Sequence, residues 1–314
     1  MIITEGLTKV FKIGKKQKQE IVAVDDLTLQ VREGEVFGFL GPNGAGKTTT
    51  VRMLTSLISA TRGKAFVNGL EVGKDNIAIR RCVGILTESP GMYERLSAEK
   101  NLQIYAQLYD VEDVTGSVNK FLHMLGLYDR RKDPVGSFSK GMRQKLAIAR
   151  SLVHDPKVLF LDEPTTGLDP EAAKMVRDFI EALKERGRTI FMCTHNLDEA
   201  DRLCDRIGIF KQHLITVDTP AGLREKLYGR KVVIHLRELD PEWASQVRGL
   251  PFIRSVEAIE QKLVVALDDP DRDNPEIIRL LVNAGADIRF VGELRHSLEQ
   301  IYLEMIHSEE GGAA

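Results

Sequence analysis

Long apolar runs, cysteine-rich segments and an excess of charge of either sign are all missing from this sequence. No apolar run approaches the ~20 residues that span a bilayer, and residues 1–12 lack the apolar stretch of a secretory signal. We therefore expect a cytosolic chain that reaches a membrane only through another protein. The three cysteines, Cys82, Cys193 and Cys204, are widely spaced, which fits a reducing compartment without disulfides. With 44 basic and 46 acidic residues, the net charge of -2 gives no general attraction to nucleic acid or to anionic lipid.

The length of 314 residues leaves room for two domains. In the first two thirds of the chain, short apolar segments alternate with helical patterns, which predicts a largely parallel α/β sheet. The expected strands cover residues 2–10, 22–31, 35–40, 158–161 and 189–193. The expected helices cover residues 48–57, 118–125, 141–152 and 171–186, and the pattern is helical from about residue 97 to residue 131.

The sequence changes character near Pro220. From there the pattern predicts strand, helix, strand, strand, helix, strand, at residues 232–236, 241–247, 253–259, 263–267, 275–284 and 287–291. This order suits a small α+β domain of the ferredoxin-like type, covering residues 219–314 and ending in a helix at 297–307. Its sequence leaves open whether it regulates, dimerises or braces the rest of the chain.

Residues 41–48 read GPNGAGKT, which matches G-x-x-x-x-G-K-[ST] in full. Glycines let successive backbone N–H groups point at phosphate, and the helix that follows adds its positive end. We expect Lys47 to reach the β- and γ-phosphates of ATP as a catalytic residue, and the Thr48 hydroxyl to ligate Mg²⁺. The residues expected to bind the nucleotide here are Gly41, Pro42, Asn43, Gly44, Ala45, Gly46, Lys47, Thr48 and Thr49. A functionless glycine turn is the alternative, and the strand and helix on either side argue against it.

Two acidic residues follow a buried strand in VLFLDEP, residues 158–164. Because ligand sites of α/β sheets lie at the carboxyl ends of the strands, Asp162 and Glu163 are placed at such a site. We expect Asp162 to hold Mg²⁺, directly or through water, and Glu163 to act as the general base on the attacking water. Two acids after a strand also suit a simple helix cap, but their pairing with a phosphate loop favours catalysis.

Further motifs follow in a fixed order. Residues 138–142 read FSKGM, residues 143–170 read RQKLAIARSLVHDPKVLFLDEPTTGLDP, and His195 follows the strand at 189–193. Together with the phosphate loop, this set resembles the ATP-binding cassette (ABC) family, whose signature motif is usually written LSGGQ. The resemblance covers about residues 1–218, as one ABC nucleotide-binding domain. It implies a P-loop NTPase core with an antiparallel β subdomain and a helical subdomain at about residues 93–155.

The resemblance also implies a head-to-tail homodimer with two ATP molecules at its interface. Ser139 and Gly141 would contact the γ-phosphate held by the other subunit, and Asp169 of the D-loop would join the nucleotide-binding residues. His195 matches the switch histidine, a catalytic residue that contacts the γ-phosphate and orients water, and Phe11 falls where an aromatic ring stacks on adenine. Taken singly, Ser139 suits a helix cap, His195 a strand-end histidine and Phe11 a core residue on an edge strand.

Two departures from the family pattern bear on the site. Glu88 falls near the position of the Q-loop glutamine, and a carboxylate there can still ligate Mg²⁺ but donates no hydrogen bond when ionised. Lys140 and Met142 replace the usual glycine and glutamine of the signature. We expect neither change to be disabling, because Ser139 and Gly141 are present.

One phosphate loop, one signature and no membrane segment together favour the detached ATPase subunit of a transporter, paired with a separate permease. The ending HSLEQIYLEMIH, residues 296–307, resembles the accessory region of bacterial exporter ATPases of the ABC-2 type, which favours export. We expect such a subunit to lie at the cytoplasmic face of the membrane. The alternative is a soluble ATP-dependent switch protein that binds a partner without transport. A nucleic-acid-associated ATPase is disfavoured by the even charge balance.

Overall fold

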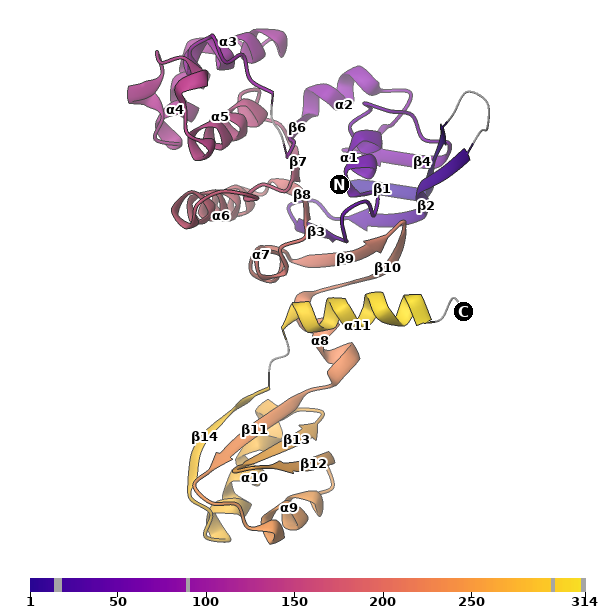
Figure 1. Cartoon of the computed structure of the whole chain (residues 1–314), viewed down its shortest axis with the longest axis vertical. Helices are drawn as coiled ribbons and strands as arrows, with labels where there is room; N and C mark the ends of the chain where they lie inside the picture. Colours follow the sequence, from indigo (N-terminus) through magenta and orange to yellow (C-terminus); the bar gives the residue numbers. More distant parts are fainter. Residues whose placement is uncertain (14–18, 89–90, 295–296, 312–314) are drawn as a thin grey trace. The chain divides into compact units, whose positions relative to one another are not determined.

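The computed structural model describes residues 1–13, 19–88, 91–294 and 297–311. The chain divides into two compact units, Met1–Val217 and Asp218–Ala314 (Figure 1). Across the described ranges, none of the helices is both long enough and apolar enough to cross a membrane.

The first unit is built on two sheets. The antiparallel sheet has the order β2-β1-β4-β5, with β1 (Ile2–Ile13), β2 (Gln19–Val31), β4 (Arg62–Val67) and β5 (Leu70–Glu71). The other sheet has the order β10-β9-β3-β8-β7-β6, with β3 (Val36–Leu40), β6 (Val83–Leu86), β7 (Val158–Asp162), β8 (Thr189–Thr194), β9 (Arg206–Lys211) and β10 (His213–Asp218). The pairs from β9 through β6 are parallel, so the carboxyl ends of β3, β7 and β8 meet at one edge. The predicted parallel α/β core and antiparallel β subdomain are thereby confirmed.

The helices of the first unit connect these strands. They are α1 (Lys47–Leu54), α2 (Asn76–Cys82), α3 (Ala98–Leu108), α4 (Val114–Met124), α5 (Lys140–Leu152), α6 (Pro170–Glu185) and α7 (Leu197–Leu203), with short 3₁₀ turns at Tyr128–Arg130 and Val135–Ser137. In Figure 1, α3, α4 and α5 lie together as a group apart from the antiparallel sheet. This group is the expected helical subdomain, and its side chains Leu102, Leu122 and Leu146 are fully buried.

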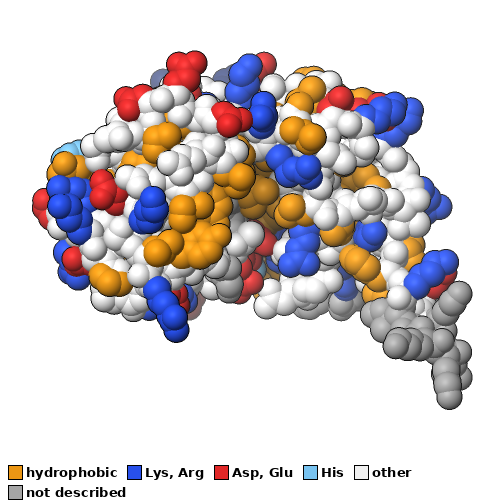
Figure 2. Space-filling model, turned by 90° about the horizontal axis from the view of Figure 1, so that it is seen from above, with side chains coloured by type: hydrophobic (Ala, Val, Ile, Leu, Met, Phe, Trp, Pro, Cys, Tyr) orange, Lys and Arg blue, Asp and Glu red, His pale blue; other side chains and the backbone are white. Residues whose placement is uncertain are grey.

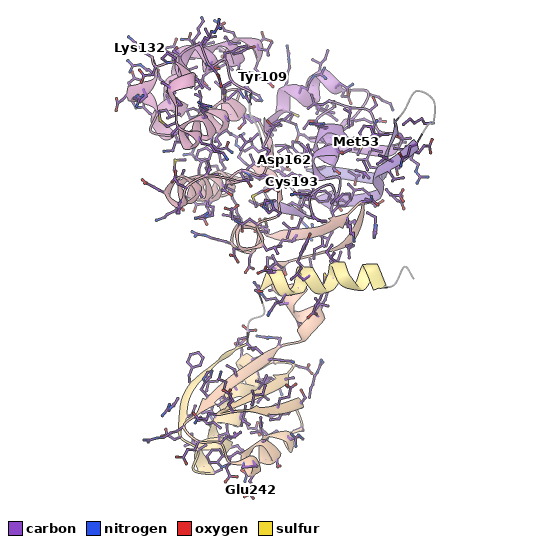
Figure 3. All side chains as sticks on the ribbon, in the orientation of Figure 1. Met53, Tyr109, Lys132, Asp162, Cys193 and Glu242 are labelled. Carbon is purple, nitrogen blue, oxygen red and sulfur yellow. The ribbon has the colours of Figure 1, made fainter. Side chains whose placement is uncertain are left out.

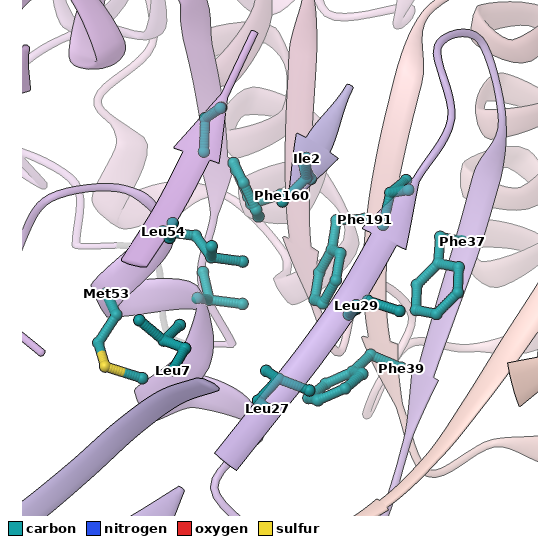
Figure 4. Close-up of a cluster of buried hydrophobic side chains, with 14 of the residues drawn as sticks. Ile2, Leu7, Leu27, Leu29, Phe37, Phe39, Met53, Leu54, Phe160 and Phe191 are labelled. Carbon is teal, nitrogen blue, oxygen red and sulfur yellow. The ribbon is translucent and has the colours of Figure 1, made fainter. Parts of the chain in front are cut away.

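A single apolar core joins the two sheets of the first unit to α1 (Figure 4). Within it, the Phe191 ring stacks on Phe37, with centroids 5.7 Å apart, and packs at a tilt against Phe39, with centroids 5.2 Å apart. Strands β3, β7 and β8 are buried at every position, which is the pattern of central strands covered on both faces. This packing fixes the strand ends from which the loops of the site emerge.

The second unit contains the predicted βαββαβ arrangement. Its strands β11 (Lys231–Leu236), β12 (Ile253–Ile259), β13 (Lys262–Leu267) and β14 (Ile288–Glu293) form an antiparallel sheet of order β12-β13-β11-β14. Helices α9 (Pro241–Arg248) and α10 (Pro270–Asn283) supply the two crossings, and α8 (Pro220–Tyr228) and α11 (Leu298–Gly311) contact each other. This is the ferredoxin-like order.

The predicted start of α10 is wrong. We placed it at Pro275, but the helix begins at Pro270, because Asp269 caps it by accepting a hydrogen bond from the Arg272 amide. Proline suits the first position of a helix, and both Pro270 and Pro275 are candidates for that position in the sequence. The helix takes the first start and carries Pro275 in its interior.

Candidate functional site

The glycine loop lies between the end of β3 and the start of α1, as the motif requires. Gly44 and Gly46 have φ values of 81° and 106°, in the left-handed region that favours glycine. At Gly46 a methyl group would also overlap the carbonyl oxygen of Ala23 on β2. The loop therefore wraps tightly, and it lines a cavity of about 380 Å³. Around that cavity lie Ala23, Pro42, Asn43, Gly44, Ala45, Gly46, Lys47, Thr48, Thr49, Glu88, Asp162 and Glu163.

Lys47 is 7% exposed at the first turn of α1. Its ammonium donates to the carbonyl of Gly41 at 2.6 Å and to that of Pro42 at 3.3 Å, so the loop folds over its own lysine. The same nitrogen is 4.0 Å from Oε1 of Glu163. A buried cation beside the N-terminus of a helix is suited to bind an anion such as phosphate.

Thr48 and Asp162 are brought together from α1 and β7. The Thr48 hydroxyl donates to Oδ2 of Asp162 at 2.8 Å, and Asp162 lies beside Cys193 of β8 in the sheet (Figure 3). Burial raises the pKa of Asp162, and the charges of Glu163 and Glu88 add to that rise. The Thr48 hydrogen bond and the Lys47 charge oppose it. A cation at this pair would relieve the cost of the buried charge.

The oxygen atoms of Thr48 and Asp162 fit Mg²⁺, which prefers oxygen ligands and usually takes few of them from the protein. Within the described ranges there is no group of three or more His, Cys, Asp or Glu side chains able to hold a metal ion alone. A cation here would therefore complete its shell with phosphate oxygens and water. Glu88 lines the same cavity and is near enough to add charge to it.

Glu163 follows β7 in the left-handed conformation, with φ 51°, and is 8% exposed. Its Oε1 lies 2.8 Å from Nδ1 of His195, and its Oε2 accepts from the Thr166 hydroxyl at 3.0 Å. The Thr194 hydroxyl is a further donor to Oε2, at 3.4 Å. Neither threonine was singled out in the sequence, because nothing in the motifs assigns a role to the hydroxyl that precedes His195 or to the one three residues after Glu163.

Ser139, Gly141 and Asp169 lie elsewhere, at the starts of α5 and α6. Ser139 accepts from the Met142 amide at 3.3 Å, and Asp169 accepts from the Ala172 amide at 2.9 Å, so both side chains cap helices. A methyl group on Gly141 would lie 3.9 Å from Oδ2 of Asp169, which puts the two helix starts side by side. No side chain of this second cluster lines the cavity within the part of the chain that the structure describes.

Three other predicted residues have distinct positions. His195 is 53% exposed and reaches the cavity only through Glu163. Gly41 contributes its carbonyl to Lys47. Phe11 is 38% exposed on β1, with the Lys9 ammonium 5.1 Å from its ring centroid, and it is not among the cavity residues of the described chain. Phe11 is thus an exposed aromatic, not the core residue that was its alternative.

A glycine loop between strand and helix, a buried lysine, and a threonine–aspartate pair at the carboxyl edge of a parallel sheet define a P-loop nucleoside triphosphatase. A family model described as "ABC transporter" matches residues 24–166. The chain belongs to the ABC transporter family, as one of its ATP-hydrolysing subunits. The family and the fold predicted from the motifs are therefore confirmed.

Relatives match over most of the chain. The bacitracin transport ATP-binding protein BcrA of Bacillus licheniformis is 34% identical over 307 residues, which are 98% of this chain and 97% of that protein. An uncharacterized ABC transporter ATP-binding protein of Bacillus subtilis, YhcH, is 37% identical over 284 residues, 90% of each chain. The fluoroquinolones export ATP-binding protein of Mycobacterium tuberculosis is 40% identical over 216 residues, 68% of this chain and 71% of that protein.

A solved structure, described as the ATP binding subunit of an ABC transporter, gives a TM-score of 0.64 at 28% identity. It covers 73% of this chain and 93% of its own. A dimeric ATP-binding cassette bound to ADP and Pi also gives a TM-score of 0.64, at 24% identity over 70% of this chain, a likeness that bears on the fold.

Proposed function

We propose that this chain hydrolyses Mg-ATP as a head-to-tail homodimer and thereby drives a separate membrane permease, in an export system. The observation that carries this proposal is the division of the predicted site into two clusters. The phosphate loop, Asp162 and Glu163 surround one cavity, whereas Ser139, Gly141 and Asp169 lie at other helix starts. Two copies placed head to tail bring the second cluster of one against the cavity of the other.

The loop amides and the charged side chains of the cavity have chemical tasks in this reaction. The loop amides and the Lys47 ammonium bind the phosphate oxygens, and Thr48 and Asp162 hold Mg²⁺. Bound there, the metal ion neutralises charge that develops on the phosphates. Glu88 adds a carboxylate to the same wall and is proposed as a further, direct or water-mediated, ligand.

Glu163 takes the proton from the attacking water at its carboxylate. Its two oxygens are oriented by His195 and Thr166, so the base is held before the substrate arrives. The partner copy then supplies a serine hydroxyl and free helix-start amides to the γ-phosphate, which closes the dimer around the nucleotide. The Phe11 side chain is exposed on β1, and its ring is proposed to stack on the adenine base.

The relatives support the coupling to a permease and the direction of transport. One is named for bacitracin transport and another for fluoroquinolone export. Ile77 of α2 is 69% exposed, Leu108 of α3 is 71% exposed, and Tyr93, in the loop before α3, is 52% exposed; these side chains offer apolar surface to a partner. The face shown in Figure 2 has hydrophobic side chains gathered beside a hollow, with Lys, Arg, Asp and Glu interspersed around them. We assign the chain to the cytoplasmic side of the membrane, held there by that partner.

The test is Glu163→Gln, which keeps the shape of the side chain and removes its basicity. We expect hydrolysis to fall by about 100-fold or more, while the variant forms a stable dimer with saturating Mg-ATP. Light scattering after size-exclusion chromatography measures the dimer, and phosphate release measures the rate. Glu242→Gln, on α9 of the second unit and not among the residues that line the cavity, is the control and keeps the wild-type rate.

A Glu163→Gln variant that stays monomeric with saturating Mg-ATP would refute the shared site. A variant that hydrolyses ATP at the wild-type rate would refute the general base. Co-purification tests the permease: a stable complex with a polytopic membrane protein supports the proposal, and a stable complex with ribosomes or DNA contradicts it.

A further inference from the structure

The two carboxylate oxygens of Glu163 are held by two different segments. Thr166, in the loop after β7, donates to Oε2 at 3.0 Å, and His195, in the loop after β8, lies 2.8 Å from Oε1 through Nδ1. The direction of the carboxylate is therefore set by the position of one loop relative to the other. Pairing of β7 with β8 fixes where the two loops begin, but a contact between the loops themselves is needed to hold Thr166 and His195 at a constant distance from each other.

Glu199 of α7 makes that connection. Its side chain is 3% exposed, and its Oε2 accepts from the Thr165 hydroxyl at 2.6 Å, one residue before Thr166. Its Oε1 is 3.2 Å from Nη1 of Arg177 on α6, and this ion pair offsets the cost of a buried charge. Both oxygens of Glu199 thus have partners, and neither faces the nucleotide cavity, which Glu199 does not line.

A short chain of hydrogen bonds links Glu199 to the histidine loop. The Glu199 amide donates to Oδ1 of Asn196 at 3.2 Å, and the Asn196 amide donates to the Thr194 hydroxyl at 3.0 Å. Thr194 and Asn196 flank His195, so the start of α7 and the histidine move together. The Thr194 hydroxyl itself lies 3.4 Å from Oε2 of Glu163.

We propose that Glu199 is a positioning residue for ATP hydrolysis, which ties the Thr165–Thr166 loop to the histidine loop so that both oxygens of Glu163 stay aligned. This inference rests on the proposed role of Glu163 as the base. Glu199 acts at one remove, through Thr165 on one side and through the start of α7 on the other. Its loss should slow the chemical step and leave nucleotide binding by Lys47 intact.

Two variants test the link from its two ends. Thr165→Val removes the hydroxyl, keeps the shape of the side chain and leaves the Arg177–Glu199 ion pair in place. Glu199→Gln keeps the side-chain length but removes the charge that pairs with Arg177. A displacement of a catalytic group by ~1 Å costs up to about 100-fold in rate, so we expect kcat to fall by about 10-fold or more in each variant. KM for ATP and the affinity for a fluorescent ATP analogue should stay within about twofold of wild type. A tenfold loss of affinity would require a loss of about 1.4 kcal/mol of binding free energy, and the phosphate loop that binds the nucleotide is unaltered in both variants.

The double variant and a matched control separate positioning from general support. If Glu199 acts through Thr165, the double variant should be no slower than the slower single variant, because the charge-assisted hydrogen bond between the two side chains is lost in all three. The control is Glu181→Gln, which removes the ion pair of Glu181 with Arg202 at 3.2 Å, also between α6 and α7 but on their exposed side. The control should keep wild-type kcat.

Measurements on the full chain with Mg-ATP decide the matter. Wild-type kcat in both Thr165→Val and Glu199→Gln would overturn the inference, and so would an equal loss in the Glu181→Gln control. A parallel loss of nucleotide affinity would also overturn it, since it would show general structural support. The proposed function fails separately, when Glu163→Gln keeps full activity; an inactive Glu163→Gln beside two active positioning variants refutes the present inference alone.

Discussion

Replacing Gly46 by alanine tests how the phosphate loop is held against the antiparallel sheet. Gly46 has φ 106°, where a side chain is strained, and a methyl group there would overlap the Ala23 carbonyl oxygen. Gly44, two residues earlier, has φ 81°, but a methyl group there would meet nothing within 4 Å. Gly44→Ala is therefore a matched control that carries the backbone strain without the overlap.

The expected magnitude has two parts. The left-handed conformation costs an alanine about 1–2 kcal/mol at either position. The overlap at Gly46 forces the loop away from β2, and overpacking of this kind costs about 1–3 kcal/mol more. Because 1 kcal/mol shifts the melting temperature of a unit of this size by about 2–4 °C, Gly46→Ala should melt roughly 4–8 °C below Gly44→Ala for an overlap near 2 kcal/mol.

Differential scanning calorimetry without nucleotide measures the first unit, and tryptophan fluorescence gives an internal reference. The single tryptophan, Trp243, lies on α9 of the second unit, so its unfolding signal should be unchanged in both variants. Titration with a fluorescent ATP analogue should show weaker binding by Gly46→Ala, because its loop is displaced. Equal melting temperatures for the two alanine variants would refute the close approach of Gly46 to Ala23.

Two further predictions concern the buried acid of the site and the core of the second unit. Because burial raises the pKa of Asp162, its ionisation costs stability above the folded-state pKa. Asp162→Asn should therefore raise the melting temperature of the metal-free first unit at pH 7 and abolish its stabilisation by Mg-ATP. The gain in melting temperature should disappear as the pH falls toward the ordinary pKa range of aspartate, where Asp162 of the wild type is protonated. A lower melting temperature of the variant at pH 7 would contradict this. Ile277 of α10 is fully buried in the core of the second unit, so Ile277→Ala should destabilise that unit by about 2–5 kcal/mol. Trp243 fluorescence during urea unfolding measures this loss, and phosphate release should be unchanged. An unaltered unfolding midpoint would refute the assigned core.

The motif-bearing parts of the fold were predictable because their chemistry is local. A glycine loop requires a strand before it and a helix after it, so residues 41–48 placed β3 and α1 together. Likewise the four apolar residues before Asp162 predicted a central strand, and β7 is buried throughout. The alternation of strands and helices then predicted the parallel sheet. In the second unit the same alternation predicted the ferredoxin-like order.

Contacts between distant segments were not predictable in this way. The approach of Ala23 to Gly46 depends on how two sheets pack, and the Glu199–Thr165 bond joins residues 34 positions apart. The lysine of the signature segment is a similar case, since the Lys140 ammonium lies over Gly167 and fills the space that a side chain there would take. Strands β9 and β10 and helix α7 were also missed, because their short segments lack a distinctive period.

The backbone at Glu163 has a consequence for the history of such chains. A glutamate with φ 51° gives up about 1–2 kcal/mol that glycine would recover. In a descendant copy that no longer depends on turnover, replacement by glycine or asparagine would be favoured by stability alone. The identity of this one residue in a duplicated gene should therefore show whether selection still acts on hydrolysis.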